Sequence, residues 1–329
     1  MAKLSSIAYY VTDKISSNDI SLAEYVTTDC ILQNKKGREV ATNLPPQPCS
    51  LIRYQRGDVL IANIRPYLKK VWFADIDGGA SPDVLVFRAK DGHSPSFLYA
   101  ILLQDSFFDY VMQGTKGSKM PRGDKEQILR YEMPTFSCSE ESIGTFFLNL
   151  DRKIHLNERI NQNLEAMAKQ LYNYWFVQFD FPNEEGKPYK SSGGKMVWNE
   201  KLKREIPFGW HCGNLFEIAV FTNGLACQKF RPKDDEASLP VIKIREMHDG
   251  ISADTEKVTP NIPESVKVYN GDVLFSWSAS LEVMLWAYGL GGLNQHIFKV
   301  TSANDFPKSF FYFQLLDYVD VFKKMAEAR

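Results

Sequence analysis

Apolar residues between positions 139 and 179 recur at the spacing of one long amphipathic helix. From Ile160 onward they advance by steps of 4, 3, 4 and 3 residues, through Leu164, Met167, Leu171 and Tyr174. This alternation is the seam of a coiled coil. Ser139 precedes two glutamates, which is typical of a capped helix start. At 1.5 Å per residue such a helix is roughly 60 Å long, and we expect it to separate two domains.

Shorter apolar runs, broken by turn residues, fill the chain before this helix. Val71–Ala74 and Val84–Phe87 are predicted strands, and Gly78-Gly79 is predicted to form a turn between them. One helix is predicted from Pro95 to Met112, because proline suits a first helical turn and Gly114 lies just past the end. This mixture predicts an α+β domain.

One phrase occurs twice, as Gly57-Asp58-Val59-Leu60 and as Gly271-Asp272-Val273-Leu274, 214 residues later. An aromatic, helix-like segment follows each copy, at 97–103 and at 310–316. The sequence therefore predicts two copies of one domain, one on either side of the helix. A protein of this design contacts two places at a fixed distance.

The predicted fold is therefore α+β, with two similar mixed α/β domains separated by a long coiled-coil-type helix. The expected segments are a first domain at 1–138, a helical spacer at 139–181, a polar linker at 182–206 and a second domain at 207–329. The offset places Arg329 opposite Thr115, before the equivalent of the long helix. We expect an incomplete second domain and a helix without an antiparallel partner, whose exposed apolar seam allows self-association.

The composition is that of an ordinary globular protein: of 329 residues, 44% are apolar and 24% are charged. No apolar run reaches the length of a membrane span, and the first residues lack the apolar core of a signal peptide. Five scattered cysteines without Cys-x-x-Cys spacing indicate reduced thiols in a cytoplasmic protein, without a metal or disulfide framework. Because the net charge is −1, any binding of nucleic acid depends on local basic patches.

Sequence motifs for catalysis are absent. The chain has no P-loop, no Gly-x-Gly-x-x-Gly loop, no Asn/Asp-Pro-Pro-aromatic methyltransferase motif and no His-Glu-x-x-His pair, and its five histidines are isolated. We therefore expect a binding module with no catalytic residue, metal or cofactor of its own.

Basic residues gather in two short segments of the first copy. One segment follows the predicted strand after the repeated phrase and contains Arg65, Tyr67, Lys69 and Lys70. The other alternates glycines with Lys116, Lys119 and Arg122. Such side chains reach base edges or phosphates, and glycine lets the backbone approach a phosphate closely. The alternative is a solvated hairpin rim and a flexible loop.

The second copy offers weaker candidates for the same role. These are Lys229, Arg231, Lys243 and Arg245.

Four further segments stand out beside the repeated phrase, at 63–70, 117–122, 156–165 and 171–181. Together they resemble the specificity subunit of type I restriction–modification enzymes, over most of the chain up to Ile206. The second copy matches more loosely, because no Arg-Pro-Tyr follows its Gly-Asp-Val-Leu phrase. The first copy has that sequence at 65–67.

The resemblance implies two target-recognition domains that each read half of a bipartite site in double-stranded DNA. It also implies helices that hold methyltransferase (M) subunits, to which restriction/translocase (R) subunits are added. S-adenosylmethionine, ATP and Mg²⁺ then belong to those partners. The residues expected to bind a partner are Leu164, Leu171, Tyr174, Trp175 and Phe176.

Other interpretations stay open at this stage. The aromatic residues after position 171 also suit a core between the helix and a domain. The whole chain also suits a coiled-coil scaffold that binds only protein, or a nuclease-associated enzyme with an unrecognised site.

Overall fold

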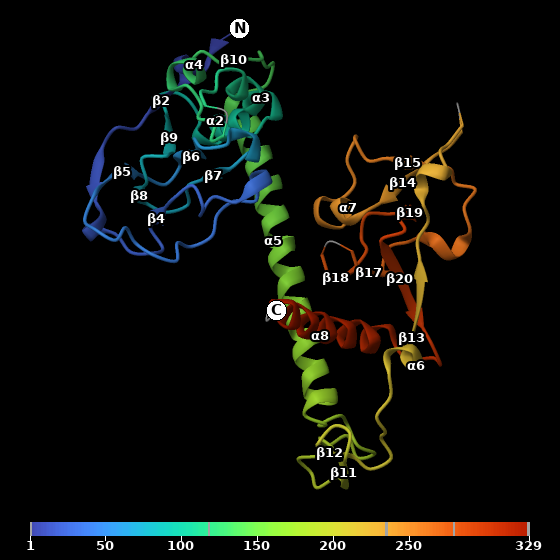
Figure 1. Cartoon of the computed structure of the whole chain (residues 1–329). Helices are drawn as coiled ribbons and strands as arrows, with labels where there is room; N and C mark the ends of the chain where they lie inside the picture. Colours follow the sequence, from blue (N-terminus) through green and yellow to red (C-terminus); the bar gives the residue numbers. More distant parts are fainter. Residues whose placement is uncertain (1, 118, 234–235, 279, 328–329) are drawn as a thin grey trace. The chain divides into compact units, whose positions relative to one another are not determined.

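The computed structural model describes residues 2–117, 119–233, 236–278 and 280–327. It divides into two compact units, Met1–Gln162 (the first unit) and Asn163–Arg329 (the second unit). The long helix α5 (Glu140–Tyr172) begins in the first unit and ends in the second (Figure 1).

Two four-stranded sheets build the first unit ahead of α5 (Figure 1). The first sheet is antiparallel and has the order β2-β9-β6-β7, with strands Ala8–Tyr10, Val84–Ala89, Val59–Ala62 and Val71–Phe73. The second has the order β3-β5-β8-β4, with strands Lys14–Ser16, Ser50–Tyr54, Gly78–Ala80 and Tyr25–Val26. A short pair joins β1 (Ala2–Lys3) to β10 (Glu132–Met133). The strands predicted near positions 71 and 84 are confirmed.

Side chains of β6 alternate between two apolar cores, as successive residues of a strand must. Val59 and Ile61 belong to the core that also contains the helices α2 (Pro95–Leu102) and α3 (Asp105–Gln113). Leu60 belongs to the other core, with Trp72. The first sheet, which contains β6, therefore has an apolar core on each face.

Two local predictions for the first unit are wrong. The single helix expected from Pro95 to Met112 is two helices, because Gln104 has an extended backbone (φ −69°, ψ 141°) that ends α2 and precedes α3. Gly78-Gly79 lies within strand β8. A Cβ atom on Gly78 would lie 2.2 Å from the carbonyl oxygen of Glu24, so close strand packing requires the glycine.

The second unit repeats the first sheet and three of the four strands of the second sheet, whose fourth strand lies at the opposite edge (Figure 1). Its first sheet has the order β13-β20-β17-β18, with strands Ala219–Asn223, Ile297–Ser302, Val273–Ser276 and Glu282–Leu285. Its second has the order β15-β14-β19-β16, with strands Lys257–Val258, Leu239–Ile242, Gly291–Leu293 and Lys267–Val268. Strand β4 is parallel to β8, and β14 is parallel to β19 in the same way. The predicted duplication is confirmed.

Short helices complete the two units. They are α1 (Leu4–Ile7) and α4 (Lys125–Leu129) in the first, and α6 (Leu215–Ile218) and α7 (Ile244–Asp249) in the second.

Helix α5 continues into one π-helical turn at Asn173–Val177. The Ser139 hydroxyl accepts a hydrogen bond from the Ser142 backbone N–H at 3.2 Å, so the predicted cap is present. Much of the apolar stripe is exposed, as expected; its exposed members in α5 include Phe146, Phe147, Leu150, Ile154, Ile160, Leu164, Met167 and Leu171.

The last turns of α5 have a helical neighbour that the sequence did not predict. In the second unit, helix α8 (Lys308–Glu327) contacts them through several side chains. The Lys169 ammonium pairs with Asp317, and the Tyr172 ring lies 5.2 Å from that of Phe313. The helix therefore has a partner at this end, although its stripe is otherwise exposed.

The polar segment after α5 is folded. Strands β11 (Met196–Asn199) and β12 (Arg204–Pro207) form a hairpin. The Phe181 ring stacks on Trp210 at 5.2 Å and on Tyr189 at 4.8 Å. Ordinary aromatic packing thus gives structure to residues that composition alone marks as a linker.

Candidate nucleic-acid interface

The repeated phrase forms the same turn in both units. Gly57 and Gly271 have φ angles of +93° and +85°, which glycine adopts without strain. The carboxylate of the next residue then accepts a backbone N–H. Asp58 accepts that of Gln55 at 2.8 Å, and Asp272 accepts that of Tyr269 at 2.8 Å. The turn leads directly into the central strand, β6 or β17.

A cation on a neighbouring strand completes each turn. Arg88 donates Nε–H and Nη2–H to the two oxygens of Asp58, at 2.8 and 2.7 Å. This bond raises the pKa of Arg88 above its ordinary value. In the second unit Lys299 takes this place, with its Nζ 2.9 Å from Asp272. The phrase that identifies the repeat is therefore a folding element at the start of a strand.

The far end of β6 carries the first predicted recognition segment. Arg65 has left-handed backbone angles (φ 53°, ψ 63°) and precedes the 3-10 turn η3 (Pro66–Leu68). Lys69 after that turn is also left-handed, with φ 50°. Tyr67 is 50% exposed at the tip. Left-handed conformations at residues other than glycine are costly and concentrate at functional sites.

Backbone hydrogen bonds join this segment to the second predicted one. The Arg65 N–H donates to the carbonyl of Pro121 at 2.8 Å, and Ile64 forms an antiparallel bridge with Arg122. The Gly123 N–H donates to the carbonyl of Asn63 at 3.3 Å. The structure thus brings together two basic segments whose joined residues, such as Ile64 and Arg122, are 58 positions apart in the sequence. We call residues 63–70, 114–117 and 119–123 the basic rim.

Several cations of the basic rim already have acceptors within the unit. Four such contacts are Lys69 with Asp105 (2.8 Å), Lys70 with the Thr28 carbonyl (2.7 Å), Lys116 with Asp124 (2.9 Å) and Arg122 with Asp83 (3.1 Å). Hydrogen bonds from Lys116, and then from the Gln127 backbone, lower the pKa of Asp124 to about 2. Arg65 and Lys119 are exposed and form no ion pair with any residue that the structure describes.

A third segment lies against the basic rim and was missed by sequence reasoning. The turn η2 (Gln33–Lys35) places the Lys35 N–H 3.0 Å from the carbonyl of Lys69. The Lys35 ammonium lies 2.7 Å from Asp105. The run Asn34-Lys35-Lys36-Gly37, a basic turn, was the signal that could have indicated it.

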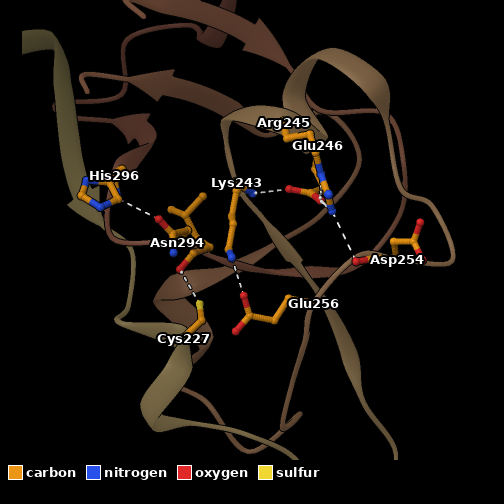
Figure 2. A network of polar contacts seen from close by, with 9 residues as sticks. Cys227, Lys243, Arg245, Glu246, Asp254, Glu256, Asn294 and His296 are labelled. Atoms are coloured by element: carbon orange, nitrogen blue, oxygen red, sulfur yellow. Dashed lines mark hydrogen bonds and ion pairs between the residues drawn. The ribbon is translucent and has the colours of Figure 1, made fainter. Parts of the chain in front are cut away.

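The candidates of the second unit divide into two pairs. Lys229 and Arg231 are exposed. Figure 2 shows the other pair within a polar network: Lys243 contacts Glu256, and Arg245 donates to Glu246 at 2.7 Å. Glu246 is buried and also accepts the backbone N–H of Lys243 at 3.2 Å. The second pair therefore has carboxylate partners in this structure.

Comparison with known proteins finds sequence similarity to type I restriction enzyme specificity subunits. No family model matches the chain. It is 24% identical over 242 residues to the type I restriction enzyme MjaIX specificity subunit of Methanocaldococcus jannaschii, which covers 72% of this chain and 51% of the relative. It is 27% identical over 188 residues to the HindI specificity subunit of Haemophilus influenzae, over 54% of this chain and 40% of the relative. The chain is a relative of type I specificity subunits.

The fold of this chain agrees with a solved structure. The type I restriction–modification S subunit from M. genitalium matches with a TM-score of 0.54 at 14% identity, over 99% of this chain and 79% of that one. At this identity the likeness shows the fold alone. The matched region spans about half the length of the first relative.

The predicted partner-binding residues of this chain lie in the last turns of α5 and in the π-helical turn that follows it. Leu164, Leu171 and Tyr174 are exposed. Trp175 and Phe176 are half-buried, and the Phe176 ring lies 4.8 Å from that of Phe310 in α8. The aromatic cluster is therefore partly core within the second unit.

An open groove of about 940 Å³ borders the same aromatic cluster. Phe176, Trp210 and Phe310 are among the residues that line it. Among the described residues, no helix is long and apolar enough to cross a membrane.

Proposed function

We propose that this chain is the DNA-recognition subunit of a type I restriction–modification complex. Each unit would read one half of a bipartite site in double-stranded DNA. The observation that carries the proposal is the duplication: the two units share the order of the first sheet and three strands of the second, and one helix of 33 residues runs from the first unit into the second. The kinship with specificity subunits supports it.

Within this proposal the basic rim is the recognition surface of the first unit. Arg65 follows the central strand, is exposed and has no carboxylate partner among the described residues, so its guanidinium is available to a guanine edge or a phosphate. Lys69, Lys116 and Arg122 neutralise nearby phosphates and position the unit on the duplex. Lys229 and Arg231 are the corresponding candidates in the second unit.

The chain supplies recognition and assembly in this proposal, and no catalytic residue. Methyltransferase subunits bind the exposed apolar side of α5 and the aromatic residues at its end. The restriction/translocase subunits join that assembly in the cytoplasm. S-adenosylmethionine, ATP and Mg²⁺ are held by those partner subunits.

Helix α5 is the spacer between the half-sites. At 1.5 Å per residue its 33 residues measure about 50 Å. Base pairs lie about 3.4 Å apart along a DNA strand. The helix thus sets how many base pairs remain unread.

Co-purification with the cognate methyltransferase subunit, followed by methylation mapping on random DNA, tests the proposal. A bipartite methylated motif is the expected result. A palindromic motif would mean that two chains assemble and each uses only its first unit. No complex and no methylation would overturn the proposal and favour a protein-binding scaffold, while metal-dependent cleavage by the chain alone would favour a nuclease-associated enzyme.

Substitution of Arg65 by alanine then separates two roles within the basic rim. If Arg65 reads a base, we expect a loss of about 1–3 kcal/mol at one position of the motif, which becomes relaxed. An equal loss on every DNA sequence would instead identify Arg65 as a phosphate contact. The methylation map of the variant distinguishes the two results.

A further inference from the structure

Two lysines from separate loops of the first unit converge on one carboxylate oxygen. Lys35 Nζ lies 2.7 Å and Lys69 Nζ lies 2.8 Å from Oδ1 of Asp105. The two ammonium groups are therefore no farther apart than the sum of these distances. Their hydrogen bonds, first that of Lys35 and then that of Lys69, lower the pKa of Asp105 to about 2. The carboxylate is thus ionised at neutral pH.

The backbone holds this arrangement in costly conformations. Asn34 and Lys35 have φ angles of 56° and 63°, and Lys69 has a φ of 50°. The Lys35 N–H donates to the carbonyl of Lys69 at 3.0 Å, so the two loops are joined by backbone as well as side chains. A convergence of left-handed residues other than glycine on one exposed surface indicates a site whose geometry has a use beyond stability.

Solvent reaches the anion in this site. The Asp105 side chain is 62% exposed, whereas those of Lys35 and Lys69 are 27% and 30% exposed. The lysines are thus held in position, and the carboxylate between them is accessible from outside. Ion pairs of an exposed carboxylate contribute little to stability, so another anion can replace it at low cost.

We propose that Lys35 and Lys69 together hold one DNA backbone phosphate, in the position that the Asp105 carboxylate occupies in the unbound protein. The turn η2 (Gln33–Lys35) is then a third DNA-contacting segment, next to the basic rim. This inference rests on the function proposed above. The phosphate oxygens accept from both ammonium groups, and the Asp105 side chain turns outward into solvent.

Asp105 has a second effect in this scheme. It competes with every phosphate for the two lysines, whatever the base sequence. It therefore lowers the affinity of the first unit for all DNA equally and leaves discrimination to the base contacts. Asp105 acts here as a positioning residue that also opposes non-specific binding.

Binding of labelled duplexes by the full chain, co-purified with its methyltransferase subunit, tests the proposal. One duplex carries the mapped site and one carries a scrambled site, and affinity is measured from about 50 to 200 mM salt. Lys35→Gln and Lys69→Gln should weaken binding to both duplexes by the same factor. Loss of one phosphate contact removes roughly 0.9 from the salt slope, so the decrease in affinity across this range should become about three- to fourfold smaller.

The double variant gives the sharpest result, because both lysines serve a single phosphate. Lys35→Gln/Lys69→Gln should reduce the salt slope by no more than the roughly 0.9 that one phosphate contact contributes. The effects of the two substitutions on the slope are therefore not additive. Asp105→Asn should tighten binding to both duplexes, since it removes the competing charge. Lys36→Gln, an exposed lysine next to Lys35, is the matched control and should have a smaller effect.

Three outcomes would overturn the inference: additive slopes, an equal effect of Lys36→Gln, or weaker binding by Asp105→Asn. Thermal unfolding of each variant shows whether a loss of binding reflects a loss of folding. A wild-type complex that does not prefer its mapped duplex would refute the proposed function itself. A wild-type complex with that preference, and with Lys35→Gln and Lys69→Gln variants that bind equally well, would refute this inference alone.

Discussion

The turn at the repeated phrase predicts that two equivalent aspartates contribute unequally to stability. The perturbation is Asp58→Asn in the first unit, compared with Asp272→Asn in the second. The Asp58 side chain is 1% exposed and accepts two hydrogen bonds from Arg88 and one from the Gln55 backbone. Asp272 is 20% exposed; it accepts one hydrogen bond from the Tyr269 backbone and, among the described residues, forms one ion pair, with Lys299.

The size of each effect follows from these contacts. Breaking a buried ion pair from one side costs about 3–5 kcal/mol. Arg88 keeps 21% of its side chain exposed, and the new amide still accepts from the Gln55 backbone. We therefore expect Asp58→Asn to cost about 2–4 kcal/mol. Asp272→Asn loses one partly solvated contact, which corresponds to about 1–2 kcal/mol.

Calorimetric unfolding of the full chain measures both effects, because each unit has its own cores. Asp58→Asn should lower the midpoint of the first unit by roughly 5–15 °C. Asp272→Asn should lower that of the second by less. Asp91→Asn, at an exposed position, is the matched control. A cost for Asp272→Asn as large as that for Asp58→Asn would refute the reasoning from burial and hydrogen-bond number.

Two further predictions concern the helical spacer α5 and the contact between Asp105 and Lys35. Insertion of seven residues after Leu164, about two helical turns, should lengthen the unread gap of the methylated motif by roughly 3 base pairs; an unchanged gap in the methylation map would mean that α5 does not set the spacing. The Asp105 carboxyl should titrate near pH 2 by NMR, because its pKa is lowered to about 2. Its contact with Lys35 is then fully present above the ordinary value near 3.8 and is lost as the pH falls through 2, and Lys35→Gln should move the midpoint up. A midpoint that does not move would contradict the contact.

Much of the architecture could be predicted from the sequence because repetition and periodicity are local signals. The two copies of Gly-Asp-Val-Leu indicated two domains, and the matching first sheets of the two units agree with that. The alternation of steps from Ile160 onward indicated the long helix. The predictions failed where distant segments decide the conformation. Gly78 looks like a turn residue, but the backbone of Glu24 approaches it and keeps it in a strand.

The candidate site shows the same division. The basic residues at 65–70 and 116–122 could be selected by composition. Their proximity could not, because it depends on the bridge between Ile64 and Arg122 and on the hydrogen bond from Arg65 to Pro121.

The sequence by itself determined the duplication, the helix between the copies and the chemical character of the recognition segments. Each of these follows from neighbouring residues, through side-chain period, backbone preference and charge. Only the tertiary structure decided which cations have carboxylate partners and which loops meet. Lys35 is 70 residues from Asp105 and 34 from Lys69, yet all three form one cluster. Strand pairing and core packing fix such distances, and no local pattern records them.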